Sequence, residues 1–406
     1  MTSTNPLPLA GTESTERSNL PSLTGLRFVA ALLVFFAHAF LLNNPLNLAV
    51  PINPYADEGL ANGLAKVFAP AGFVGVSFFF VLSGFVLAWS SRPGERVQAF
   101  LRRRLLKIFP NHLVAWALVM VLFAAAYTPL HAWLPNLFLV HSWIPLDDTN
   151  SSVNVPAWSL CSELLFYLMF PFIIRPLMRI RESRLWWWAG GAVAAIAVVA
   201  VIARYVIPEG THFVLAPLPL TQMWFAYLFP PSRMFEFILG ILLARIVLAG
   251  RWPRIGVIPV LLLAVAGYTA VIFVPAPFNF VLVMVVPIAA IIGTAATADI
   301  RGSRSVLRTP LMVWLGTVSF GFYIIQAVPI FYGRLELFGG DTYSFPVATA
   351  LLLGLFLATL FLGWLLYRFV EAPVMRRWSR SRRSTPPLPP VPGLVPAPST
   401  GTTTGR

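Results

Sequence analysis

The sequence predicts an all-α, polytopic integral membrane protein with about ten transmembrane helices. Three observations lead to this prediction: 58% of the 406 residues are hydrophobic, only 11% are charged, and the mean hydropathy is +0.77. Soluble domains contain about 25% charged residues, so the composition excludes a soluble globular enzyme and a disordered chain. Cys161 is the only cysteine, which excludes an intramolecular disulfide scaffold and a cysteine-based metal site.

The ten spans are windows of about 20 mostly apolar residues, the length that crosses about 30 Å of hydrocarbon. We expect them near residues 22–42, 70–90, 108–127, 157–178, 186–206, 231–248, 256–274, 278–298, 311–333 and 346–370. The stretch 208–230 is apolar but interrupted by prolines. We therefore expect an interfacial loop there, rather than an eleventh span.

The basic residues indicate how the spans are oriented. Lys and Arg outnumber Asp and Glu by 29 to 15, and they concentrate in alternate connections between spans. The connections on the opposite side contain only Lys66 and Arg334. The positive-inside rule then predicts a plasma-membrane protein with both termini in the cytoplasm. The net charge of +14 is mainly a topology signal, and no nucleic-acid partner is expected.

Three regions are expected along the chain: a cytoplasmic N-terminal tail at 1–21, a transmembrane domain at 22–373, and a cytoplasmic tail at 374–406. The first region carries Glu13 and Glu16 and has no basic n-region, so no removable signal peptide is indicated. The last region is rich in arginine and then in proline. This composition cannot bury a core and predicts disorder.

Span one contains two ionisable residues, Arg27 and His38. Ionisable groups inside spans are costly, so each is a functional candidate. Eleven steps of about 100° return almost to the starting direction, which places both residues on one helix face, about 16 Å apart along the axis. The structural alternative is an arginine that snorkels to the interface and a histidine bonded to a nearby carbonyl.

Small residues mark span two, in the segment GFVGVSFFFVLSGF, which contains Ser77, Ser83 and Gly84. Close helix packing explains most of these residues, and the backbone that they expose is also open to a ligand.

A basic cluster follows in FLRRRLLKIFP, with Pro110 expected in the first turn of span three. Arg104 and Lys107 share a helix face at i, i+3. With Arg102 and Arg103 they provide the charge that a cytoplasmic ligand with several phosphates requires.

Span four begins with WSLCSELLFY, and we expect Trp158 at the outer interface and Glu163 slightly deeper. Glu163 would then lie at a depth similar to that of His38, as an acid–base pair. Arg233 and Glu236 in span six read as a structural ion pair within the membrane. No metal site is predicted, because the remaining histidines lack convergent spacing: His112, His131, His141 and His212.

Seven segments in order resemble the membrane-bound acyltransferase-3 family, whose members O-acetylate bacterial surface sugars and some macrolide antibiotics. They cover the chain from residue 22 to 373: SLTGLRFVAALLVFFAH, GVSFFFVLSGF, RRLLKIFP, WSLCSELLFY, RMFEFILG, LGTVSFGFYIIQ and YRFVEAP. The resemblance implies transfer of an acetyl or other short acyl group from acyl-coenzyme A to a hydroxyl, with no permanently bound cofactor.

The resemblance also assigns roles by position. Arg27 and His38 correspond to the family's essential pair, and Ser83 and Gly84 correspond to its SGF turn. Arg104 corresponds to the first arginine of its RxxR motif, and Glu163 corresponds to the acid of its WSLxxE segment. Three positions depart from the family pattern: Lys107 replaces a second arginine, Ser77 a common aspartate, and Gln326 a common histidine. We expect structural or supporting roles for Ser77, Trp158, Arg233, Glu236, Gln326 and Glu371.

The residues and the resemblance together predict a mechanism. The donor is expected to contact Arg27, Ser83, Gly84, Arg102, Arg103, Arg104 and Lys107. His38 then deprotonates the acceptor hydroxyl or carries the acyl group transiently, and Glu163 supports its charge. Direct transfer is favoured, because no activated serine or cysteine is evident. The acceptor stays open between a glycan or lipid-linked sugar and a hydrophobic macrolide-type metabolite, as do the acyl length and the oligomeric state.

Two other classes of protein compete with this interpretation. A transporter or flippase for an amphipathic solute also needs buried charges and small residues, although paired repeats with interrupted helices, which are common in transporters, are not evident. A non-catalytic sensor or scaffold is supported only by the proline-rich tail. A requirement for acyl-coenzyme A distinguishes the enzyme from both.

Overall fold

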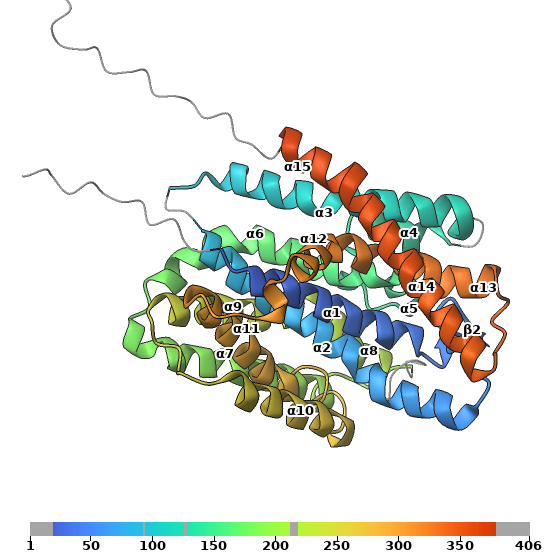
Figure 1. The fold of residues 1–406 in the computed structure, drawn as a ribbon, viewed down its shortest axis with the longest axis horizontal. Helices are drawn as coiled ribbons and strands as arrows, with labels where there is room; N and C mark the ends of the chain where they lie inside the picture. Colours follow the sequence, from blue (N-terminus) through green and yellow to red (C-terminus); the bar gives the residue numbers. More distant parts are fainter. Residues whose placement is uncertain (1–18, 92–93, 126–127, 212–217, 379–406) are drawn as a thin grey trace, which may run out of the picture.

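Helices make up most of the computed structural model, which describes residues 19–91, 94–125, 128–211 and 218–378 (Figure 1). The principal helices are α1 (Pro21–Ala39), α2 (Glu58–Ser90), α3 (Val97–Val119), α6 (Trp158–Met178), α7 (Leu185–Tyr205), α9 (Met234–Leu248), α10 (Val257–Phe273), α11 (Leu282–Ile300), α12 (Pro310–Ile325) and α14 (Phe345–Leu365). Short elements connect them: β1 (Asn43–Asn44), β2 (Asn47–Pro51), α4 (Leu130–Leu137), α5 (Asp147–Asn150), α8 (Leu220–Met223) and α13 (Arg334–Glu336).

Several helices continue through tighter or wider turns. A π-helical turn, Met120–Ala124, extends α3, and another, Leu366–Glu371, joins α14 to α15 (Ala372–Trp378). A third, Val328–Gly333, follows α12 after a bend of 49°. The 3₁₀ turns are His141–Trp143, Val155–Ala157, Glu182–Arg184, Pro230–Arg233 and Val306–Arg308. The strands β1 and β2 pair in antiparallel fashion.

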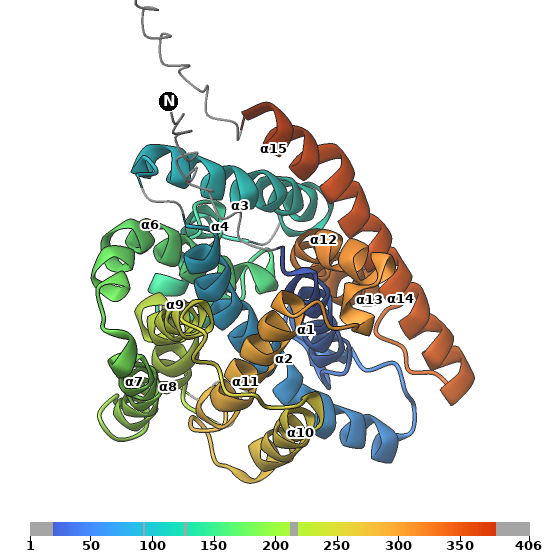
Figure 2. The ribbon, with the colours of Figure 1, turned by 60° about the vertical axis from the view of Figure 1, so that its left-hand side comes forward.

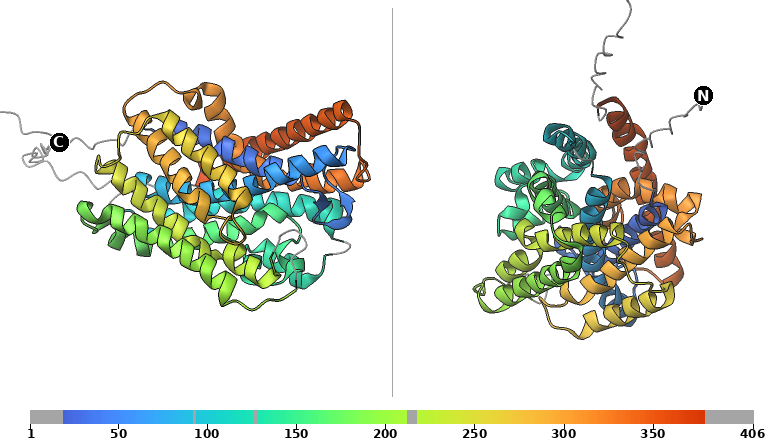
Figure 3. Two further views of the ribbon diagram at one scale, coloured as in Figure 1. Left: turned by 90° about the horizontal axis from the view of Figure 1, so that it is seen from below. Right: turned by 90° about the vertical axis from the view of Figure 1, so that its left-hand side faces the viewer.

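The core is built around α2, which packs against α1 and α9, while α1 packs against α12 (Figure 2). Figure 3 shows the bundle from below and from one end, with the blue helices α1 and α2 in its interior. Two glycines allow α2 and α9 to cross closely: a Cβ on Gly84 of α2 would lie 2.0 Å from the carbonyl oxygen of Phe237, and one on Gly240 of α9 would lie 1.9 Å from that of Val81. The small residues of span two thus serve close packing at Gly84.

The start of α1 is capped by another helix. The residue before it, Leu20, provides no side-chain cap. Instead, Asp299 near the end of α11 accepts hydrogen bonds from the backbone N–H and the hydroxyl of Ser22, at 2.8 and 2.7 Å. Arg308 lies 3.5 Å from the same carboxylate. The beginning of α1 and the end of α11 therefore lie at one end of the bundle.

We call this end the arginine-rich end. It is defined by the residues that follow α2, α6, α9 and α11 and by those that begin α3: Arg96, Arg102, Arg179, Arg181, Arg184, Arg251, Arg254, Arg301, Arg304 and Arg308. The end of α9 is tied to the end of α6, because Arg245 donates to the carbonyl oxygens of Leu177 and Ile180 at 2.6 and 2.8 Å.

The ten predicted windows all contain helix, but ten spans are not confirmed. Within the described residues, seven helices are long and apolar enough to cross a membrane, or eight if α12 and its bent continuation form one span. The windows 231–248 and 256–274 fall short, because α9 has 15 residues and α10 has 17. The chain thus has the character of a multi-pass membrane protein.

Several predicted boundaries differ from the structure. α3 begins at Val97, so the arginine cluster is helical and Pro110 lies inside the helix rather than in its first turn. The reason is that Arg, Leu and Lys are good helix formers and extend the span into the basic segment. Part of the predicted loop 208–230 forms short helical turns from Leu220 onward. Helix α15 continues to Trp378, beyond the expected boundary at 373, and most of both predicted tails lies outside the described residues.

Candidate active site

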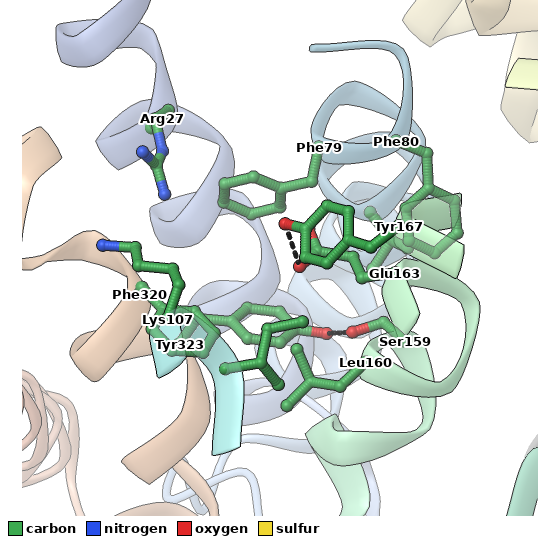
Figure 4. A pocket seen from close by; sticks show the side chains of 12 residues that line it. Arg27, Phe79, Phe80, Lys107, Ser159, Leu160, Glu163, Tyr167, Phe320 and Tyr323 are labelled. Atoms are coloured by element: carbon green, nitrogen blue, oxygen red, sulfur yellow. Dashed lines mark hydrogen bonds between the residues drawn. The ribbon is translucent and has the colours of Figure 1, made fainter. Parts of the chain in front are cut away.

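A cavity lies inside the bundle, where α1, α2, α3, α6 and α12 meet (Figure 4). Its volume is about 60 Å³. The polar side chains that line it are Arg27, Lys107, Ser159, Glu163, Tyr167 and Tyr323, and the apolar ones are Val76, Phe79, Phe80, Ile108, Leu160 and Phe320. A polar cavity enclosed by apolar helices is costly unless its groups pair with one another or with a ligand.

Glu163 supplies the carboxylate of this cavity. The hydroxyl of Tyr167, one helical turn further along α6, donates to its Oε2 at 3.2 Å, as the dashed line in Figure 4 marks. Glu163 also interacts electrostatically with Arg27, Arg104 and Lys107. The structure thus brings one predicted catalytic residue together with three of the predicted donor-binding cations.

Lys107 has a second carboxylate partner, Glu371, in the π-helical turn after α14. The other oxygen of Glu371 accepts from the Asn111 side chain at 2.8 Å. Glu371 is 4% exposed, so its charge is compensated by these two groups of α3. Lys107, which replaces the second arginine of the family pattern, therefore has its own counter-ion in Glu371 from the last span.

The four basic residues predicted to bind donor phosphates do not converge. Arg102 is exposed, and Arg103 forms an ion pair with Glu95. Arg104 lies over the rings of Phe100 and Tyr167, at 5.7 and 5.8 Å from their centroids. A helix turns by about 100° per residue, so consecutive arginines point in different directions. Only Arg104 and Lys107 face the bundle.

Trp158, which was expected at the outer membrane interface, lies inside the bundle rather than at its surface. It is 8% exposed, and its ring is 4.7 Å from that of Tyr227. The reason is the segment before α6, whose polar side chains are buried and bonded to the bundle: Ser142 donates to the carbonyl of Trp158 at 3.1 Å, and Asn154 donates to that of Ile324 at 2.9 Å. Helix α6 therefore begins deep in the bundle.

This deep start sets the depth of Glu163. Arg27, which lies near the beginning of α1, lines the same cavity as Glu163, whereas His38 lies three helical turns further along α1. The structure therefore places Glu163 at the depth of Arg27, in contrast to the depth near His38 expected from the sequence.

His38 lies outside the lining of the cavity. Its imidazole packs edge-on against Phe331, at 5.2 Å between ring centroids, and the side chain of Gln326 faces it. Gln326 is completely buried and donates to the carbonyl of Tyr323 at 2.8 Å. Since Tyr323 lines the cavity, α12 contacts both the cavity and the surroundings of His38.

Two residues of span two have distinct neighbours. Ser83 is close enough to Tyr167 to interact with its hydroxyl, which places Ser83 beside the cavity. Ser77 is completely buried and accepts a hydrogen bond from Arg233 at 3.2 Å.

The structure confirms the predicted ion pair between Arg233 and Glu236. Their side chains are separated by 2.8 Å and are 0% and 1% exposed. The guanidinium also lies 4.5 Å from the ring centroid of Tyr227 and 5.2 Å from that of Phe80. The pair is fully enclosed by α2, α9 and the turn before α9, and neither residue lines the cavity, which supports a structural role.

Three polar residues of the cavity were not predicted from the sequence: Tyr167, Ser159 and Tyr323. The Ser159 and Tyr323 hydroxyls lie 2.7 Å apart, and Tyr323 donates to the carbonyl of Pro156 at 3.1 Å. The spacing of Glu163 and Tyr167 at i, i+4 was a usable signal, because it places both on one helix face. Within the described residues, no group of three or more His, Cys, Asp or Glu side chains could hold a metal ion.

Comparisons with known proteins agree on one family. The model of the acyltransferase-3 family, described as an acyltransferase domain, matches residues 20–368. "Acyltransferase MdmB" of Streptomyces mycarofaciens is 39% identical over 376 residues, which cover 89% of this chain and 93% of that protein.

Two more distant relatives match as well. "Exopolysaccharide production protein ExoZ" of Rhizobium meliloti is 25% identical over 77% of this chain and 92% of its own. "Peptidoglycan O-acetyltransferase OatA" of Listeria monocytogenes is 24% identical over 89% of this chain and 56% of its own. No solved structure matches the chain. The family match spans the helices that build the cavity, and the chain belongs to the acyltransferase-3 family.

Proposed function

We propose that this protein is a membrane O-acyltransferase that moves an acetyl or other short acyl group from acyl-coenzyme A to a hydroxyl. The acceptor would be a glycan or lipid-linked sugar, or a macrolide-type metabolite. Membership of the acyltransferase-3 family supports the reaction class. The observation that carries the proposal is the cavity in which Arg27, Lys107 and Glu163 meet within an apolar bundle.

The donor enters from the arginine-rich end in this proposal. Coenzyme A is anionic and cytoplasmic, and the excess of arginine at this end is the pattern of a cytoplasmic face in a plasma-membrane protein. Arg102 is exposed there, and Arg104 and Lys107 continue the positive charge into the bundle. Their charges favour a phosphate or the polarised carbonyl of the thioester.

His38 is the proposed base. It takes the proton of the acceptor hydroxyl as the hydroxyl oxygen attacks the thioester carbonyl. The carbon–sulfur bond then breaks, and the proton passes from the imidazole to the departing thiolate, giving the ester and free coenzyme A. Arg27 and His38 share one face of α1 about 16 Å apart, so a donor extended along this face reaches both.

The role proposed for Glu163 changes with the geometry. Its neighbours are Arg27, Arg104, Lys107 and Tyr167, so we assign it to holding these cations around the donor rather than to supporting the charge of His38. A carboxylate beside three cations fixes their side chains and limits the net positive charge that the bundle must bury.

The test is transfer of radiolabel from acetyl-coenzyme A in membranes containing the protein. Lipid-extractable small products are then separated from polymeric glycan. His38→Ala should abolish the transfer, while His131→Ala, a matched substitution at an exposed histidine, should preserve it.

The fraction that contains the label identifies the class of acceptor. Full activity of His38→Ala would refute the assignment of the base. Absence of any transfer dependent on acyl-coenzyme A, with longer acyl donors also tried and both classes of acceptor supplied, would refute the enzyme and favour a transporter.

A further inference from the structure

A second, basic groove lies on the outside of the bundle, at the connection between α6 and α7. Its volume is about 410 Å³, and it is lined by Pro176, Arg179, Ile180, Arg181, Arg184 and Trp188. It shares no lining residue with the cavity around Glu163, so the proposed acyl transfer does not account for it.

The three groove arginines lack carboxylate partners in the part of the chain that the structure describes. Within the described residues, Arg179, Arg181 and Arg184 form no ion pair and no side-chain hydrogen bond. Neighbouring arginines are satisfied: Arg251 lies 3.3 Å from Glu182, and Arg245 binds two backbone carbonyls. Topology explains why this connection is basic. It does not explain why three uncompensated guanidinium groups face one groove.

The connection that forms the groove is held in place. Arg245 bonds to the carbonyls of Leu177 and Ile180, which fixes the chain between the two helices. Trp186 stacks on Trp252 with ring centroids 5.7 Å apart. The arginines therefore project from a fixed backbone and can bind an anion at a low entropic cost.

The surface beside the groove is apolar and exposed. Phe172 stands one helical turn before Pro176 on α6 and is 71% exposed, and Trp187 is 82% exposed. On α7, Gly191 follows Trp188 by three residues, and a Cβ at Gly191 would meet no atom within 4 Å. Tryptophan is typical of the membrane interface. These features are typical of a surface where a charged headgroup borders the hydrocarbon, and Gly191 leaves open space for an acyl chain.

We propose that this groove binds the phosphate of an anionic phospholipid headgroup. Arginine suits this ligand because its planar donors bind phosphate oxygens in pairs. Basic pockets at the cytoplasmic ends of transmembrane helices favour anionic headgroups in this way. The exposed Phe172 and the open space at Gly191 favour a lipid over a soluble phosphate, because both would contact its acyl chains.

The experiment measures lipid binding by native mass spectrometry of the delipidated full-length protein. The probes are phosphatidylglycerol, neutral phosphatidylcholine, and inorganic phosphate as a competitor. The groove variant is Arg179→Gln/Arg181→Gln/Arg184→Gln. The matched control is Arg254→Gln/Arg301→Gln/Arg304→Gln, which removes the same charge from exposed positions at the same end of the bundle.

The wild-type protein and the control should bind phosphatidylglycerol in preference to phosphatidylcholine. The groove variant should lose at least about tenfold in affinity for phosphatidylglycerol, since each basic residue near an anionic lipid surface contributes about 1 kcal/mol, or about fivefold. Equal losses in both variants would show diffuse attraction and overturn the proposal, as would no loss in the groove variant.

Displacement of the lipid by millimolar inorganic phosphate would identify a soluble anion as the ligand and likewise overturn the lipid assignment. Thermal unfolding checks that every variant is folded. If the triple groove variant does not fold, Arg181→Gln and Arg184→Gln replace it singly, with a loss of about fivefold expected for each and unchanged affinity counting against the groove.

Discussion

Glu371, in the turn after α14, is the counter-ion of Lys107 on α3, although the two residues are 264 positions apart in the chain. The last span is otherwise one of the least buried, with 17% of its most apolar window inside the bundle. This ion pair and the bond from Asn111 therefore fix the last span against the helix that brings Lys107 to the cavity.

Removing the Glu371 charge should destabilise the protein. In Glu371→Gln, Lys107 loses its charged partner although only 26% of its side chain is exposed. We expect a loss of about 1–3 kcal/mol in the free energy of unfolding. Thermal unfolding in detergent measures it. Glu209→Gln is the matched control, because Glu209 is 73% exposed and lies 3.7 Å from Arg204. Equal stability of the two variants would contradict a structural role for the buried pair.

Glycine at position 84 should be essential for folding. In Gly84→Ala, the new methyl group would lie 2.0 Å from the carbonyl oxygen of Phe237, so α2 and α9 must separate. We expect a loss of at least about 2–3 kcal/mol, or no folded protein. Gly190→Ala is the control, since nothing lies within 4 Å of its Cβ and alanine favours a helix by up to about 1 kcal/mol. Size-exclusion chromatography shows whether each variant is monodisperse, and the unfolding temperature measures its stability.

The cap from Asp299 should stabilise the start of α1. Asp299→Ala removes two hydrogen bonds to Ser22 and the partner of Arg308, and the loss of a helix cap costs about 1–2 kcal/mol. Asp57 caps α2 by accepting a hydrogen bond from the backbone N–H of Leu60. The loss of stability in Asp57→Ala therefore gives the cost of removing an ordinary cap, with which the loss in Asp299→Ala is compared. Hydrogen exchange of the first turn of α1 should accelerate in Asp299→Ala, and unchanged exchange there would argue against the cap.

The spatial separation of His38 from Glu163 predicts how their substitutions combine. Residues that share no partners have additive effects, within about 0.5 kcal/mol. The unfolding free energies of His38→Gln and Glu163→Gln should therefore add in the double variant. Arg27→Gln and Glu163→Gln should be coupled, by about 1 kcal/mol or more, because both line one cavity. Coupling between His38 and Glu163 would instead restore the acid–base pair expected from the sequence.

The sequence predicted the helices better than their depth. All ten apolar windows contain helix, because a long apolar run without water must satisfy its backbone internally. The depth of α6 was not predictable in this way. The polar segment before it enters the bundle only because Ser142 and Asn154 reach backbone carbonyls of Trp158 and Ile324, and such bonds between distant segments leave no periodic pattern.

The candidate site was predicted in part for the same reason. Glu163 stood out because ionisable residues are costly in spans, and Lys107 stood out as part of a basic cluster suited to phosphates. Both line the cavity. Ser159 and Tyr323 did not stand out in the sequence, because hydroxyl groups in spans are common. They indicate a site only when two helices bring them together. Single-chain periodicity also assigned no partner to Lys107, because its counter-ion comes from the other end of the sequence.

The length of α2 has a consequence for the acceptor. Its 33 residues extend about 50 Å, which exceeds the thickness of about 30 Å of hydrocarbon, and the helix begins at the end of the bundle opposite the arginine-rich end. Beside it, the buried Arg334 donates to the carbonyls of Ile52 and Asp341 at 3.1 and 2.8 Å. These contacts form a fixed rim around the end of α1 that carries His38. In the proposed reaction, an acceptor that approaches His38 from this side would have to pass the rim.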